Sequence, residues 1–68
     1  MAKVVRFFKT KQNALQFIAT ARKRFPCIQY GTSYMAGGHY HAMLTGDISP
    51  EVAEQLKGRR DTGFTFIP

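Results

Sequence analysis

The pair Gly37-Gly38 lies between two runs of residues that favour β-strands, Cys27–Met35 and His39–Thr45. The tight two-residue turns that join antiparallel strands need positive φ angles, which glycine adopts without strain. The pair therefore predicts a β-hairpin with these two glycines as its loop. The loop fixes the register, and the expected partners are Ala36 and His39, Tyr34 and His41, Thr32 and Met43, and Tyr30 and Thr45.

Directly opposed residues of a hairpin point to the same side of the sheet. One expected face carries rings with polar tips and suits an open surface: Ile28, Tyr30, Thr32, Tyr34, His39, His41, Met43 and Thr45. The other face is smaller and more apolar, which suits packing against helices: Cys27, Gly31, Ser33, Met35, Tyr40, Ala42 and Leu44.

The segment Lys3–Lys9 is rich in β-branched and aromatic residues and predicts a first strand. A charged side chain is rarely buried without a partner, so we expect Arg6 to point to the open face. Because alternate residues of a strand point to opposite faces, Val4 and Phe8 should accompany Arg6 there. Val5 and Phe7 should then face the core.

Two helices are predicted from capping residues and apolar spacing. Thr10 is a suitable N-cap for a helix over Lys11–Arg24, which Pro26 ends. Its apolar stripe consists of Ala14, Ile18, Ala21 and Phe25, widened by Leu15 and Phe17. The second helix should cover Pro50–Lys57, with Ser49 as N-cap, proline at the first helical position and Gly58 after the last turn.

The turn Asp61-Thr62-Gly63 should lead into a last strand over Gly63–Ile67. The element order is therefore strand, helix, strand, strand, helix, strand, which is the ferredoxin-like βαββαβ pattern of α+β proteins. In that fold, a four-stranded antiparallel sheet carries both helices on one face and leaves the other face open. The 68 residues suffice for a single small domain, 1–68.

The chain is basic, with ten Lys and Arg residues against four Asp and Glu and a net charge of +6. This charge favours polyanions as partners, although it also serves solubility alone. The single Cys27 excludes an internal disulfide and fits a reducing, cytoplasmic setting. No apolar run approaches the length of a membrane span, so no membrane partner is expected.

The expected open face offers rings on which unpaired bases could stack. It would display Arg6, Phe8, Tyr30, Tyr34, His39 and His41, with either Phe64 or Thr65. The segment Gly63-Phe64-Thr65-Phe66-Ile67 resembles the aromatic box of the RNA-recognition-motif domain over five residues. In that family the box lies on the third strand, whereas here it lies on the fourth.

His39 and His41 share a face but lack further ligands for a metal site, so neither a metal nor another cofactor is expected. Gly38-His39-Tyr40-His41 resembles the segment of small HicA-like ribonuclease toxins, in which a histidine lies near a glycine turn. That resemblance implies acid–base work on RNA by His39 or His41. The chain otherwise lacks paired carboxylates and a phosphate loop, and we expect it not to be an enzyme.

The expected function is a non-enzymatic module that binds DNA or RNA through its open aromatic face. Backbone phosphates would be bound by the cations Arg22, Lys23, Arg24, Arg59 and Arg60. The alternative is a small regulator or inhibitor of the kind that phages and mobile elements encode. It would bind a host protein through the same face or through an edge strand, and either module could form a homodimer.

Overall fold

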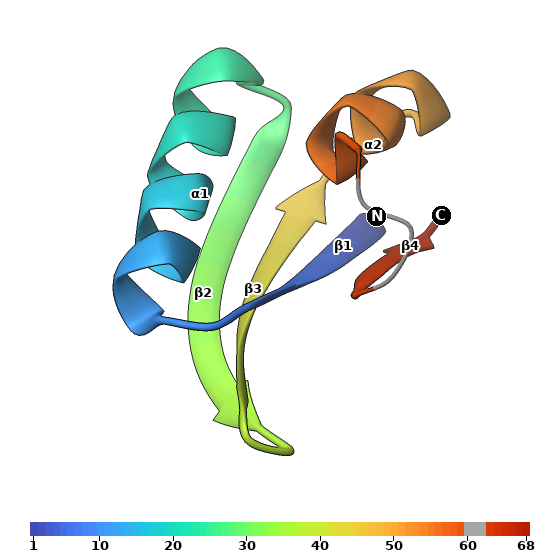
Figure 1. Ribbon diagram of the computed structural model, residues 1–68. Coiled ribbons are helices and arrows are strands. Elements are labelled where there is room, and N and C mark those ends of the chain that lie inside the picture. The colour runs from blue at the N-terminus through green and yellow to red at the C-terminus, as the bar shows by residue number, and fades with distance from the viewer. Residues whose placement is uncertain (60–62) are drawn as a thin grey trace.

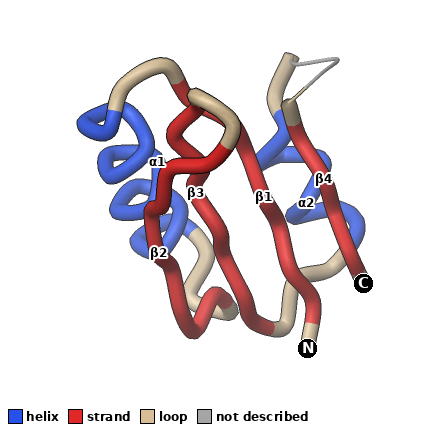
Figure 2. Tube along the Cα trace, turned by 90° about the horizontal axis from the view of Figure 1, so that it is seen from below, coloured by secondary structure: helices blue, strands red, loops and turns tan. Residues whose placement is uncertain are grey.

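A computed structural model describes residues 1–59 and 63–68 of the chain. Its elements are β1 (Ala2–Phe8), α1 (Lys11–Arg24), β2 (Ile28–Ala36), β3 (His39–Gly46), α2 (Pro50–Lys57) and β4 (Phe64–Ile67). The strands form one antiparallel sheet in the order β2-β3-β1-β4 (Figure 1). Both helices lie on one side of this sheet, as Figure 2 shows. The predicted α+β, ferredoxin-like fold is confirmed.

The β2–β3 hairpin has the predicted loop and register. Gly37 and Gly38 have φ angles of 59° and 80°, which explains why glycine occupies both positions of the turn. The pairs run from Ala36 with His39 at the turn to Tyr30 with Thr45, as predicted. A register irregularity then follows between Ile28 and Tyr30.

This irregularity overturns the predicted placement of Ile28. A β-bulge inserts one residue into a strand and reverses the alternation beyond it. Ile28 is consequently buried in the core instead of lying on the open face.

The helices begin and end at the predicted residues, and both predicted caps form. The Thr10 hydroxyl accepts from the Asn13 N–H at 3.2 Å, and the Ser49 hydroxyl accepts from the Val52 N–H at 3.2 Å. The predicted stripe of α1 buries Ala14, Ile18 and Ala21. The predicted turn residues Asp61 and Thr62 lie outside the described residues. No helix in the described part of the chain is long and apolar enough to cross a membrane.

The core lies between the helices and one face of the sheet. Its fully buried centre pairs Val4 of β1 with Leu44 of β3, and Ala42 lies beside them. The helix α1 approaches β2 closely at Gly31. A Cβ at Gly31 would lie 2.6 Å from Ile18 Cγ2 and 3.1 Å from Leu44 Cδ2, so this position has no room for a side chain.

The orientation of β1 is the reverse of the predicted one. Val4, Arg6 and Phe8 face the helices, because Val4 pairs with Leu44 and Arg6 with Ala42. On β4, the same register puts Phe64 and Phe66 on the helix side and Thr65 on the open side. Of the two candidates for the open face, Phe64 and Thr65, the structure therefore selects Thr65.

Candidate functional site

The open face of the sheet is a grid whose rows run across the strands. One row contains Tyr30, Thr45, Lys3 and Ile67, and the next contains Thr32, Met43, Val5 and Thr65. The third row contains Tyr34, His41 and Phe7, and His39 follows at the hairpin turn. Tyr30 and Tyr34 lie four residues apart on β2, roughly 13 Å at the rise of a strand.

Four rings contact one another at the hairpin end of this face, and we call them the ring cluster: Phe7, Tyr34, His39 and His41. The His41 ring lies 4.9 Å from the Tyr34 ring, with an angle of 16° between their planes. On its other side, His41 lies 4.1 Å from Phe7, and Phe7 lies 5.7 Å from His39. The rings therefore form a continuous layer across three strands.

His41 is the buried centre of the ring cluster. Its exposed fraction is 9%, and its Nε2 lies 3.1 Å from the Ala36 carbonyl oxygen. Because a carbonyl can only accept a hydrogen bond, Nε2 carries the proton in this contact. The Nδ1 atom is buried and has no hydrogen-bond partner among the described residues. His41 thus holds Tyr34 and Phe7 in place and offers little of its own surface to a ligand.

Tyr34 and Tyr30 are the accessible aromatic side chains of the open face. Their exposed fractions are 41% and 56%. His39 is also exposed, and its Nδ1 lies 3.1 Å from the Gly37 carbonyl oxygen. An exposed aromatic ring is suited to stacking against another flat group.

The charge on the open face comes from Lys3, which shares a row with Tyr30. The four described strands contain two charged residues, Lys3 and Arg6, and neither of them is acidic. Three of the four acidic residues, Asp47, Glu51 and Glu54, follow β3 or lie in α2. No acidic side chain of the described strands therefore opposes an anion on this face.

The predicted placement of Arg6 and Phe8 on the open face is wrong. The Arg6 guanidinium lies 4.8 Å from the Phe17 ring and donates from Nη1 to the Leu56 carbonyl oxygen at 3.1 Å. Phe8 packs beside the same helix, with its ring 5.2 Å from that of Phe17. Arg6 was expected to need solvent around its charge. The Phe17 ring and the Leu56 carbonyl stabilise the guanidinium in place of solvent.

Phe7 is the residue of the ring cluster that the sequence analysis missed. It was expected in the core, but its pairing with His41 places it on the open face. The sequence held no signal for this placement, because it follows from the register of β1 with β3, in which Val4 lies opposite Leu44 and Phe7 points to the other side.

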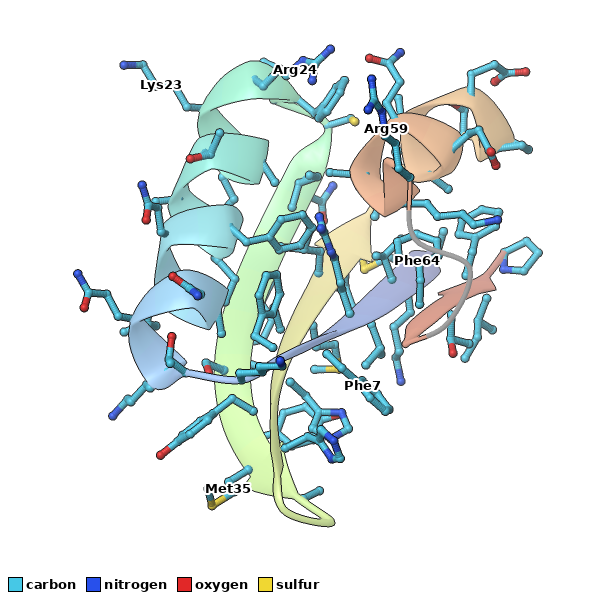
Figure 3. The ribbon with its side chains drawn as sticks, in the orientation of Figure 1. Phe7, Lys23, Arg24, Met35, Arg59 and Phe64 are labelled. Carbon is cyan, nitrogen blue, oxygen red and sulfur yellow. The ribbon has the colours of Figure 1, made fainter. Side chains whose placement is uncertain are left out.

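Three of the predicted phosphate-binding cations lie at the other end of the molecule from the ring cluster (Figure 3). Figure 3 shows Lys23, Arg24 and Arg59 around the ends of the two helices, far from Phe7 and Met35. Arg24 donates to Gln55 Oε1 at 2.7 Å and lies 5.0 Å from the Phe25 ring. These three cations therefore do not gather around the ring cluster, and Arg60 lies outside the described residues.

Arg22 is placed differently from its neighbours, at the outer edge of β2. Its Nη2 donates to the Gln29 carbonyl oxygen at 3.4 Å, next to Tyr30. Among the predicted cations that the structure describes, Arg22 is the one whose hydrogen-bond partner, Gln29, adjoins a tyrosine of the open face in the chain.

A groove separates the two helices above Arg6, with a volume of about 180 Å³. Its lining residues are Arg6, Phe17, Thr20, Ala21, Arg24, Phe25, Gln55 and Leu56. In the part of the chain that the structure describes, no three His, Cys, Asp or Glu side chains come together as a metal site would require. Cys27 is a half-buried free thiol.

Comparison of the chain with protein-family models, with curated proteins and with solved structures found no match.

Proposed function

We propose that the protein binds single-stranded nucleic acid on the open face of its sheet. The observation that carries this proposal is the layer of rings made by Tyr34, His41 and Phe7, with Tyr34 exposed. Unpaired bases stack on such rings with little regard to sequence. Tyr30, in the far row, supplies a second ring for a base further along the same strand.

Electrostatics supports the same proposal over a longer range. The net charge of +6 attracts a polyanion, and acidic side chains are absent from the described strands. Lys3 on the face and Arg22 at its edge lie beside Tyr30 and would bind backbone phosphates there. The cations at the helix ends contribute to attraction without touching the stacked bases.

The experiment is fluorescence anisotropy of labelled single-stranded RNA, single-stranded DNA and duplex DNA, titrated with the protein at low and moderate salt. Tyr34→Ala should weaken binding of the single strands by about 1–3 kcal/mol, the usual contribution of one stacked base. Duplex DNA should bind more weakly than either single strand, because its bases are already stacked.

Met35→Ala is the matched control for this experiment. Met35 is the next residue of β2, it points to the opposite side of the sheet, and its exposed fraction is 60%. If Tyr34→Ala and Met35→Ala bind the single strands as tightly as the unchanged protein does, the open face is not the binding surface.

A protein partner on the same face is the second candidate function, as in a small regulator or inhibitor of a host protein. This second function is favoured by the exposed side chains of Tyr30, Tyr34 and Ile67. The described strands place a single lysine, Lys3, on this face, so the face is largely uncharged. For such a partner, Tyr34→Ala abolishes binding, whereas reversing the charge of Arg59 changes it little. Absence of nucleic-acid binding at low salt, with capture of a partner that Tyr34→Ala abolishes, would select this function.

A further inference from the structure

The strand β2 is an exposed edge of the sheet, and its β-bulge lies at the beginning, between Ile28 and Tyr30, so the rest of the strand continues without a bulge. The whole strand is nine residues long, from Ile28 to Ala36, and contains neither a charged residue nor a proline. Alternate residues of an edge strand direct their N–H and C=O groups away from the sheet, where another strand can pair with them. Arg22 reaches the Gln29 carbonyl from that side, so it covers the beginning of the edge.

The opposite edge of the sheet is shorter and adjoins a proline. The strand β4 has four residues, Phe64–Ile67, and Pro68 follows directly. Proline has no N–H to donate, and short strands offer few hydrogen bonds to a partner. The two edges are therefore unequal, and β2 is the one available for pairing.

Exposed apolar side chains gather along β2. Of the large hydrophobic residues that are exposed, Tyr30, Tyr34 and Met35 belong to β2 itself, with Met35 at the end of the strand in Figure 3. Leu15 is 48% exposed and lies seven residues before Arg22, which places it on the same stripe of α1. That stripe faces β2, because the Arg22 side chain lies beside Gly31.

We infer that β2 pairs with β2 of a second copy of this chain, antiparallel about a two-fold axis at Thr32. In that register, Tyr30 of one copy lies opposite Tyr34 of the other, because the two tyrosines are equally far from Thr32. Cross-strand aromatic pairs stabilise antiparallel strands. The two sheets then form one continuous sheet, with four tyrosines on the open face at the junction.

The absence of charge on β2 permits a second copy as the occupant, and the symmetry of the strand favours it. Two molecules of net charge +6 repel each other wherever cationic surfaces meet. The uncharged strand β2 is a surface that two copies can bring together without placing like charges directly opposite each other. A two-fold contact also needs a self-complementary surface, and the symmetric spacing of Tyr30 and Tyr34 supplies it.

This inference goes beyond the proposed function and is tested without nucleic acid. Sedimentation equilibrium over a dilution series should give twice the chain mass of 7.7 kDa at high concentration. Thr32→Lys puts two like charges opposite each other at the axis and should weaken dimerisation roughly tenfold or more. Thr65→Lys is the matched control, since it makes the same change on the open face of β4 and should leave the dimer intact.

A mixing experiment separates repulsion at the axis from damage to the fold. Thr32→Lys and Thr32→Glu copies should each be mainly monomeric alone and should form mixed dimers together, with circular dichroism spectra that match the unchanged protein. A monomer at every concentration, or a Thr32→Lys protein that dimerises as tightly as the unchanged one, would overturn the inference.

Discussion

The two histidines of the hairpin differ in role although they lie two residues apart. His41 is 9% exposed, lies between Tyr34 and Phe7 and donates to the Ala36 carbonyl, whereas His39 is exposed beside the turn. Burial and neighbouring rings therefore make His41 a structural residue of the ring cluster. This placement leaves His39 as the accessible histidine for any contact with a ligand.

We expect His41→Ala to lower the free energy of unfolding by about 2 kcal/mol, because it opens a cavity between two rings and removes a hydrogen bond. His39→Ala, at an exposed position, should change it by less than about 0.5 kcal/mol. Urea unfolding followed by circular dichroism measures both values. Equal losses for the two variants would contradict the assignment of His41 as the centre of the cluster.

Arg6 shows how its surroundings decide the face to which a charged residue points. Its guanidinium lies against Phe17 and donates to the Leu56 carbonyl on the helix side of the sheet. We therefore expect Arg6→Gln to lower the urea midpoint and to leave the affinity for single-stranded nucleic acid within about twofold, well below the loss of a stacked base. The same anisotropy titration checks this, and a large loss of affinity in a fully folded Arg6→Gln protein would contradict it.

At the scale of elements, the contact between α1 and β2 depends on a glycine. A side chain at Gly31 would collide with the Cγ2 methyl of Ile18 and crowd Leu44. Gly31→Ala should therefore lower the free energy of unfolding by about 1–3 kcal/mol, as overpacking of a core does.

Ile18→Leu provides the companion variant, because leucine lacks the β-branched methyl that an alanine at residue 31 would meet. The loss caused by Gly31→Ala should be smaller in the Ile18→Leu background, giving a coupling that a double-mutant cycle measures. Strictly additive losses would show that the crowding at Gly31 has another origin.

At the scale of the whole molecule, the structure places Lys23, Arg24 and Arg59 far from the ring cluster (Figure 3). Lys3 lies in the row of Tyr30 on the open face, whereas Lys23 lies at the end of α1. If bound nucleic acid follows the open face, Lys3→Gln should reduce the slope of log affinity against log salt by about one. Lys23→Gln should reduce this slope less. A larger reduction for Lys23→Gln than for Lys3→Gln would show that nucleic acid binds at the helix ends instead.

The sequence by itself determined the elements, their order and the hairpin register. These features depend on neighbouring residues: Gly37 and Gly38 permit the positive φ angles of the turn, and Thr10 and Ser49 cap the helices through their own hydroxyls. Because such signals act over a few residues, they can be read before the chain is folded.

The tertiary structure alone decided which way β1 faces and that Phe7 joins the ring cluster. Alternation in β1 is compatible with either orientation, and the pairing of Val4 with Leu44 selects one of them. The two paired residues lie 40 positions apart in the chain. As a result, Phe7 lies on the open face. Arg6 lies between the helices, where its guanidinium contacts the Phe17 ring of α1 and donates to the Leu56 carbonyl of α2. No local pattern encodes such contacts, because their partners meet only in the folded chain.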